Sequence, residues 1–275
     1  MKHYCIYTNT HKDRDLLITE QIRSFLTLHG ERCMVKTSPE DEIHQDVDCI
    51  LVLGGDGTML QAARDVMERK GVALLGINLG TLGYLTEVEP ENMEKALLRL
   101  MDGDYELESR MMLNGIIKNP EGDRAEGWAL NDIVISKAEG KQVLQFTVSV
   151  NSRMLNRYLA DGIIVTTPTG STGYNLSAGG PIAEPGARLL ILTPICPHTI
   201  NQRSIILSPE DEIIIDIPFG REGQIQHAAA SFDGCIMPMQ TGDSIRIVKS
   251  EKTTDFIKLS KAGFLEVLRK KMSDN

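Results

Sequence analysis

Four absences narrow what this 275-residue sequence encodes. No apolar run approaches the roughly 20 residues that cross a membrane, and the opening MKHYCIYTN lacks the apolar core of a signal peptide. No long run of Lys or Arg offsets the formal net charge of −9, which argues against a nucleic-acid partner held through its phosphates. Internal repeats and low-complexity tracts are also missing. We therefore expect a cytoplasmic, globular protein without membrane or nucleic-acid partners.

Paired metal-ligand cysteines are absent as well. The five cysteines are odd in number and widely spaced (Cys5, Cys33, Cys49, Cys196 and Cys235). This usage is typical of reduced thiols, and we expect no metal site built by the protein. The phosphate-binding pattern GxxxxGK[ST] does not occur either. A polyphosphate ligand of so acidic a protein would need divalent cations for much of its neutralisation.

The hydrophobic and charged fractions, 41% and 24%, allow a sizeable core and predict two domains. Up to residue 104, apolar strand-like runs alternate with helical patterns, which predicts a parallel sheet covered on both faces. From Tyr105 the apolar period changes to two, which predicts a β-rich domain over 105–254. The tail, 255–275, is assigned to the first domain because 256–272 reads as an amphipathic helix that packs there or on a neighbouring subunit.

One glycine loop carries the strongest chemical signal. The apolar run 50–53 ends at Gly54-Gly55-Asp56-Gly57, and a helical pattern begins at Thr58. Glycines between a strand and a helix expose backbone N–H groups that bind anions such as phosphate. A carboxylate there repels phosphate unless it takes a proton from a hydroxyl or holds a metal, so Asp56 suggests chemistry as well as binding. Alternatively, Asp56 only turns the chain or caps the helix.

Two further stretches, both in the β-rich half, carry clustered polar groups. Asn131-Asp132 precede an apolar strand, although an isolated pair of this kind more often marks a turn. The stretch 158–182 begins with Asp161 and continues into a loop rich in glycine and hydroxyl groups that contains Tyr174. Small donors, acceptors and an aromatic face suit the base and ribose of a nucleotide. A short capped helix or buried hairpin is the other interpretation.

Together these motifs resemble bacterial NAD kinases over most of the chain. They are GGDGT at 54–58, an NxGxLG-type loop at 78–83, the Asn-acid pair at 131–132, ADG at 160–162, TPTGSTGY at 167–174 followed by SAGGP, and SFDG at 231–234. GGDGT alone is shared with lipid kinases and, loosely, with 6-phosphofructokinases. The ADG and TPTGSTGY blocks are the discriminating part.

The resemblance implies an α/β + β fold. An N-terminal Rossmann-like α/β domain with a parallel sheet is followed by a C-terminal β-sandwich-like domain, and a C-terminal helix packs back on the first domain. It further implies transfer of the γ-phosphoryl group of ATP, or of polyphosphate, to the 2′-hydroxyl of the adenosine ribose of NAD, with a divalent metal such as Mg²⁺. Homodimers or homotetramers are implied, in which a neighbour contributes to the pocket.

The resemblance also carries residue roles over. Asp56 matches the catalytic aspartate, although the sequence leaves open whether it accepts the hydroxyl proton or orients the hydroxyl. The matching nucleotide-binding residues are Asp56, Gly57, Asn131, Asp132, Asp161, Thr172, Gly173, Tyr174, Asn175 and Ser177. Two of these depart from the common pattern, since Asp132 stands where Glu is frequent and Gly173 where Ala is frequent. The competing functions are a lipid kinase of the same superfamily and a non-catalytic NADP(H)-binding sensor.

Overall fold

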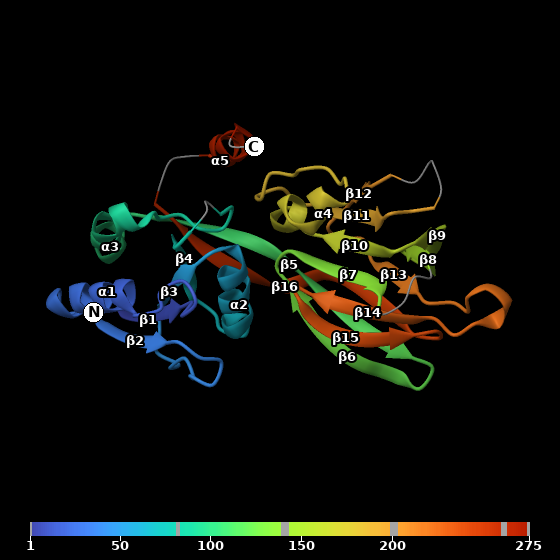
Figure 1. The fold of residues 1–275 in the computed structure, drawn as a ribbon, viewed down its shortest axis with the longest axis horizontal. Helices are drawn as coiled ribbons and strands as arrows, with labels where there is room; N and C mark the ends of the chain where they lie inside the picture. Colours follow the sequence, from blue (N-terminus) through green and yellow to red (C-terminus); the bar gives the residue numbers. More distant parts are fainter. Residues whose placement is uncertain (1, 81–82, 139–142, 199–202, 260–262, 274–275) are drawn as a thin grey trace. The chain divides into compact units, whose positions relative to one another are not determined.

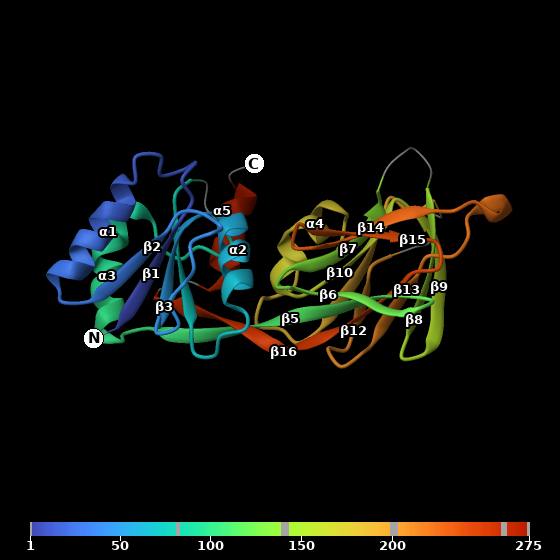
Figure 2. The same cartoon turned by 90° about the horizontal axis from the view of Figure 1, so that it is seen from below.

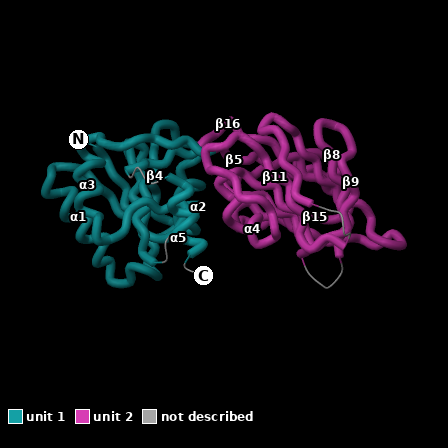
Figure 3. Tube along the Cα trace, turned by 90° about the horizontal axis from the view of Figure 1, so that it is seen from above, with its two compact units in different colours: residues 1–110, 254–275 teal, residues 111–253 magenta. Residues whose placement is uncertain are grey.

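The computed structural model describes residues 2–80, 83–138, 143–198, 203–259 and 263–273, and Figure 1 labels its helices and strands. The chain forms two compact units (Figure 3). Unit 1 comprises residues 1–110 and 254–275, and unit 2 comprises residues 111–253. The chain leaves unit 1 within strand β5 (Glu106–Asn119) and returns to it within strand β16 (Ser244–Lys258).

Unit 1 is built on a parallel sheet with the strand order β2-β1-β3-β4, and the end of β16 pairs in parallel with β4. These strands are β1 (His3–Thr8), β2 (Arg32–Lys36), β3 (Cys49–Gly54) and β4 (Ala73–Asn78). Every residue of β1, β3 and β4 is buried, as expected of strands covered on both faces. The predicted α/β architecture is confirmed, and the carboxyl ends of β1, β3 and β4 share one edge of the sheet.

Helices cover both faces of this sheet. In Figure 2, α1 (Leu17–Leu28) and α3 (Met93–Asp102) lie on one face, and α2 (Asp56–Val66) lies on the other. A short 3₁₀ turn, η1 (Pro90–Asn92), leads into α3. Ile22, Leu26 and Leu97 are fully buried against the sheet in the core that α1 and α3 share. The helical spacing of the apolar residues therefore decides which face of each helix is buried.

The tail differs from the sequence-based expectation. The predicted helix over 256–272 is wrong at its start, because β16 continues to Lys258 and helix α5 (Phe264–Ser273) begins later. Phe256 is buried and pairs with Leu74 of β4, so long-range strand pairing overrides the local helical pattern. Helix α5 does pack on unit 1, where the Phe264 and Tyr84 ring centroids lie 6.4 Å apart.

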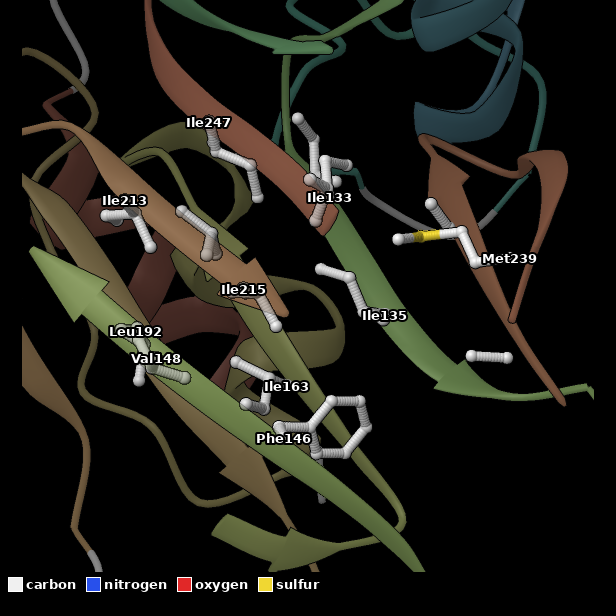
Figure 4. Close-up of a cluster of buried hydrophobic side chains, with 14 of the residues drawn as sticks. Ile133, Ile135, Phe146, Val148, Ile163, Leu192, Ile213, Ile215, Met239 and Ile247 are labelled. Atoms are coloured by element: carbon white, nitrogen blue, oxygen red, sulfur yellow. The ribbon is translucent and has the colours of Figure 1, made fainter. Parts of the chain in front are cut away.

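Unit 2 is a sandwich of antiparallel strands. One sheet has the order β12-β11-β10-β7-β14-β15, and the other joins β16, β13, β8 and β9 with the β5–β6 hairpin. Isoleucines of β7, β10, β13 and β16 interdigitate with Phe146 in the core between the sheets (Figure 4). The predicted β-sandwich-like domain is confirmed. The strands are β6 (Gly122–Ala129), β7 (Asp132–Lys137), β8 (Leu144–Val150), β9 (Arg153–Ala160), β10 (Gly162–Thr166), β11 (Leu190–Ile195), β12 (Ile205–Leu207), β13 (Ile213–Asp216), β14 (His227–Phe232) and β15 (Cys235–Gln240).

Short helical segments and one tryptophan complete unit 2. The helical segments are η2 (Thr169–Thr172), α4 (Tyr174–Ser177) and η3 (Arg221–Gly223). Trp128, the single tryptophan of the sequence, lies near the end of β6 and is partly exposed. The ammonium group of Lys252 lies 3.7 Å from the centroid of its ring, which is cation–π contact distance. Trp128 and Lys252 both belong to unit 2, and Trp128 lies three residues before Asn131 in the sequence.

Candidate active site

The GGDGT loop leads directly from β3 into α2, whose first residue is Asp56. Gly55 is the N-cap, and its carbonyl oxygen accepts hydrogen bonds from the N–H groups of Thr58 (3.0 Å) and Met59 (3.1 Å). A Cβ atom at Gly54 would lie 2.3 Å from Thr58 Oγ1, so only glycine fits there. The predicted helix start at Thr58 is therefore two residues late. Asp56 and Gly57 lie in the first turn, where the helix dipole favours anions.

The carboxylate of Asp56 is fixed by the loop that follows β4. It accepts hydrogen bonds from the backbone N–H groups of Tyr84 (2.9 Å) and Leu85 (3.0 Å), one on each oxygen. A Cβ atom at Gly83 would lie 2.1 Å from Asp56 Oδ1, so the close approach of this loop requires glycine. Residues 81–82 of the predicted NxGxLG loop lie outside the described residues. The two glycine motifs of the sequence thus meet at one carboxylate.

Two buried oxygen atoms near this loop lack hydrogen-bond partners within the described chain, namely Asn78 Oδ1 and Thr86 Oγ1. Asn78 ends β4 and donates its amide hydrogen to the carbonyl of Gly80 (2.8 Å). Both residues line a cavity of about 430 Å³ that α3 and α5 also border. Buried polar atoms are normally paired, so ligand or water atoms complete this part of the site.

Asp56 is the candidate ligand of this loop for a divalent cation. Mg²⁺ takes few protein ligands and keeps its waters and substrate phosphates, so one carboxylate fits such an ion. The described residues contain one group of three potential metal ligands, His3, His44 and Asp46. His3 begins β1, whereas the glycine loops follow the opposite ends of the strands. That group therefore lies at the other edge of the sheet and does not belong to this site.

In unit 2, the turn between β14 and β15 holds the Asn131-Asp132 pair. Asp233 and Gly234 form this turn with positive φ angles of 45° and 91°. The Asp233 carboxylate accepts hydrogen bonds from the backbone N–H groups of Leu130 (2.7 Å), Asn131 (3.1 Å) and Asp132 (2.9 Å). The sequence analysis identified SFDG as a family motif but did not assign Asp233 to the site. Only the motif could have indicated this role, because the residues that Asp233 bonds lie about a hundred positions earlier in the chain.

Burial and a neighbouring charge change the chemistry of Asp132. Loss of water on burial, together with the smaller effect of the negative charge of Asp233, raises the pKa of its carboxyl group to about 7. Asn131 Oδ1 is buried and has no hydrogen-bond partner among the described residues. Asp132 is also the register partner of Thr166, the last residue of β10. The start of β7 thus offers an unpaired acceptor and a carboxyl group that titrates near neutral pH.

The segment after β10 is two short helical turns, in agreement with the short-helix interpretation. Asn175 is fully buried, and its side-chain N–H group donates to the carbonyls of Ser171 (3.0 Å) and Pro181 (2.9 Å). Its Oδ1 accepts a hydrogen bond from the Thr193 hydroxyl (2.7 Å). These contacts use Asn175 to hold the segment together. Thr172 and Gly173 are partly buried, whereas Tyr174 and Ser177 are exposed.

Asp161 immediately precedes β10 and forms an ion pair with Lys137, whose Nζ lies 2.9 Å from Asp161 Oδ1. The segment that contains Tyr174 leaves the far end of β10 and folds back over the strand. Ala178, just after α4, packs against the buried cluster that contains Ile195, which is the register partner of Gly162 at the start of β10. The single pocket predicted around Asp161 and Tyr174 stays a prediction.

The comparisons with known proteins decide the family. Residues 3–105 match the ATP-NAD kinase N-terminal domain, and residues 130–259 match the ATP-NAD kinase C-terminal domain. The NAD kinase of Lachnospira eligens is 41% identical, covering 99% of this chain and 100% of that protein. That of Agathobacter rectalis is 44% identical, covering 100% and 99%. This chain belongs to the NAD kinase family.

Two solved structures resemble the fold of this NAD kinase family member. An NAD kinase from Archaeoglobus fulgidus in complex with ATP has a TM-score of 0.78 and 28% identity, covering 98% of this chain and 99% of that one. Yeast NADH kinase complexed with NADH has a TM-score of 0.80 at 23% identity, covering 100% and 88%, and shows the fold alone. In the described part of this chain, none of the helices has the length and apolar character needed to span a bilayer.

Proposed function

We propose that this protein phosphorylates NAD with ATP, transferring the γ-phosphoryl group to the 2′-hydroxyl of the adenosine ribose and giving NADP. The fixed carboxylate of Asp56 on the anion-binding first turn of α2 carries the proposal. Phosphoryl transfer passes through a loose transition state, so the protein mainly positions groups and neutralises charge. The family's named relatives support the same reaction.

We assign the transfer chemistry to unit 1. The N–H groups around Gly57 bind donor phosphates, and Asp56 orients the ribose hydroxyl and takes its proton as the O–P bond forms. Asp56 would hold a divalent cation such as Mg²⁺, which would supply neutralisation of the charge on the donor phosphates. A protein that only binds the dinucleotide gains nothing from a carboxylate aimed at phosphates, which disfavours a sensor that binds without turnover.

We assign recognition of NAD to unit 2. Asn131 offers its unpaired oxygen to a donor of the nucleotide, and Asp132 in its protonated form donates a hydrogen bond. The exposed ring of Tyr174 stacks on the ligand, and Thr172, Gly173 and Ser177 line the same surface. Asn175 supports this surface from beneath.

A homodimer or homotetramer is part of the proposal. The resemblance to NAD kinases supports it, because in that family a neighbouring protomer contributes to the pocket, and Asp161 is the residue that we assign to this role. We also propose that the protein acts in the cytoplasm, which the five free thiols support.

The test is a coupled assay on the purified protein. Incubation with NAD, ATP and Mg²⁺, followed by an NADP-specific dehydrogenase, should reveal NADP, and a parallel reaction with polyphosphate settles the donor. A lipid kinase would instead phosphorylate diacylglycerol in mixed micelles. Failure to form NADP with any donor or divalent metal, despite measurable NAD binding, would establish the sensor function instead.

A further inference from the structure

The loop between β1 and α1 is tied to the first turn of α2. The carbonyl of Asn9 accepts hydrogen bonds from the N–H groups of Lys12 and Asp13, both at 3.0 Å. The side-chain amide of Asn9 donates to Thr58 Oγ1 (3.1 Å), and Thr58 belongs to the GGDGT motif. Asp13 in turn accepts hydrogen bonds from the N–H and hydroxyl groups of Thr19 (2.9 and 2.7 Å). These bonds fix where the backbone of Lys12 lies.

This backbone position brings the Lys12 ammonium group to both glycine loops. A Cβ atom at Gly55 would lie 3.0 Å from Lys12 Nζ, and one at Gly80 would lie 3.1 Å from the same atom. Gly55 precedes Asp56, and Gly80 follows the end of β4. The ammonium group therefore lies where the carboxyl ends of β3 and β4 meet, within reach of both backbones. A side chain at either glycine would crowd the ammonium group and displace it by a few tenths of an ångström.

Within the described chain, the Lys12 ammonium group has no hydrogen bond and no ion pair, and the residue is exposed. By contrast, Lys36 and Lys137 each contact a carboxylate or a carbonyl group. An unpaired cation held at two glycine loops is a ready partner for an anion, and ammonium groups bind phosphate as compact point charges. The protein otherwise carries a net charge of −9, so a local cation matters for a polyanionic substrate.

We propose that Lys12 binds the terminal phosphates of the phosphoryl donor and neutralises the charge that develops on them during transfer. It takes the part that the lysine of GxxxxGK[ST] plays in other nucleotide-binding loops, from a different loop of the chain. The proposal rests on the proposed function for its donor, ATP. Sequence reasoning assigned phosphate binding to backbone N–H groups alone, because nothing in the local pattern NTHKD marks a phosphate ligand.

The test compares Lys12→Met with wild type, with Lys12→Arg as the charge-keeping variant. Lys70→Met removes another exposed lysine of unit 1 and serves as the matched control. Steady-state kinetics should show that Lys12→Met lowers kcat/KM for ATP roughly ten-fold or more, as loss of a charge-assisted contact predicts, with KM for NAD unchanged. Lys12→Arg should recover part of the loss, and Lys70→Met should match wild type. The melting temperature should not move, because no contact of the fold is removed.

Calorimetric titration with Mg·ATP measures the same contact without turnover. Lys12→Met should bind ATP more weakly, and NAD binding should match wild type. Unchanged ATP kinetics and affinity, or equal losses for ATP and NAD, would overturn the role of Lys12. If wild type binds ATP but forms no NADP, the proposed reaction fails while the titration still decides on Lys12. If wild type binds no ATP, the inference about Lys12 is wrong as well.

Discussion

Asp56 owes its orientation to groups outside its own motif. Its helix sets the position of its Cα atom, but the backbone N–H groups of Tyr84 and Leu85 set the direction of the carboxylate. Preorganised groups reduce the reorganisation needed at the moment of reaction.

Replacement of this carboxylate should separate binding from turnover. Asp56→Asn removes the acceptor for the hydroxyl proton and places an amide hydrogen against one backbone N–H group. We expect kcat to fall on the order of a hundred-fold or more, with the NAD dissociation constant close to wild type. Steady-state kinetics and calorimetry measure the two quantities. A variant with nearly intact turnover would show that Asp56 is not the reacting group.

Asp132 should make stability depend on pH. In the unfolded chain its pKa is near 3.9, whereas in the folded protein it is raised to about 7. The contribution of this group is therefore fully present below about pH 4 and is lost as the pH rises through 7. Asp132→Asn removes the dependence, so from pH 5 to pH 8 the variant should gain roughly 2 kcal/mol in unfolding free energy relative to wild type.

Urea unfolding followed by circular dichroism at both pH values measures the effect. Asp123→Asn, at an exposed acid of the same unit, is the control and should show no such change. Equal pH profiles for wild type and Asp132→Asn would mean that Asp132 is ionised throughout this range.

At the scale of elements, the loop after β4 acts as a clamp for the start of α2, which means that its backbone N–H groups hold the Asp56 carboxylate in place. Gly83 is the residue that lets the two approach, since any side chain would meet the Asp56 carboxylate. The loop and the helix are consecutive along one sheet edge because β3 and β4 are parallel neighbours. Displacement of either one moves the Asp56 carboxylate.

A single methyl group tests this clamp. Gly83→Ala should lower kcat at least roughly ten-fold, because the added methyl group displaces the Asp56 carboxylate. A displacement of a catalytic group by about 1 Å lowers the reaction rate strongly. Gly186→Ala, where a Cβ atom would meet nothing within 4 Å, should leave kcat unchanged. Kinetics of both variants, with melting temperatures to verify folding, give the comparison. Wild-type kcat in Gly83→Ala would show that the carboxylate tolerates a different position.

Sequence patterns predicted the elements well where burial alone decides them. Strands β1, β3 and β4 of unit 1 are fully buried and mostly apolar, and the fold class followed from the alternation of such runs with helices. The prediction was wrong at the start of the tail, because Phe256 fits a helical pattern of apolar residues but lies in β16, where it pairs with Leu74 of β4. The motifs located Asp56 and Asn131, but the partners that orient them, Tyr84 and Asp233, lie far away in the chain. Such contacts arise from tertiary packing, which local periodicity does not encode.

At the scale of the whole molecule, the proposed oligomer would make activity depend on assembly. If a neighbouring protomer supplies Asp161 to the pocket, each site is complete only where two chains meet.

Mixed oligomers test the sharing. Asp56→Asn and Asp161→Asn chains should each be inactive alone, but co-expressed chains should regain about one quarter of wild-type activity, because random pairing leaves that share of sites with both native residues. Differently tagged chains allow purification of the mixed species for the NADP assay. Activity that stays at the level of the single variants would show that each site lies within one protomer.

The position of Trp128 gives the two units separate spectroscopic signals. Indole emission comes from unit 2 alone, because no other tryptophan exists in the chain, and the nearby Lys252 ammonium group makes the emission sensitive to its surroundings. The helices that dominate the far-ultraviolet signal belong mainly to unit 1. Fluorescence and dichroism recorded on one denaturant series thus distinguish cooperative from stepwise melting without a label.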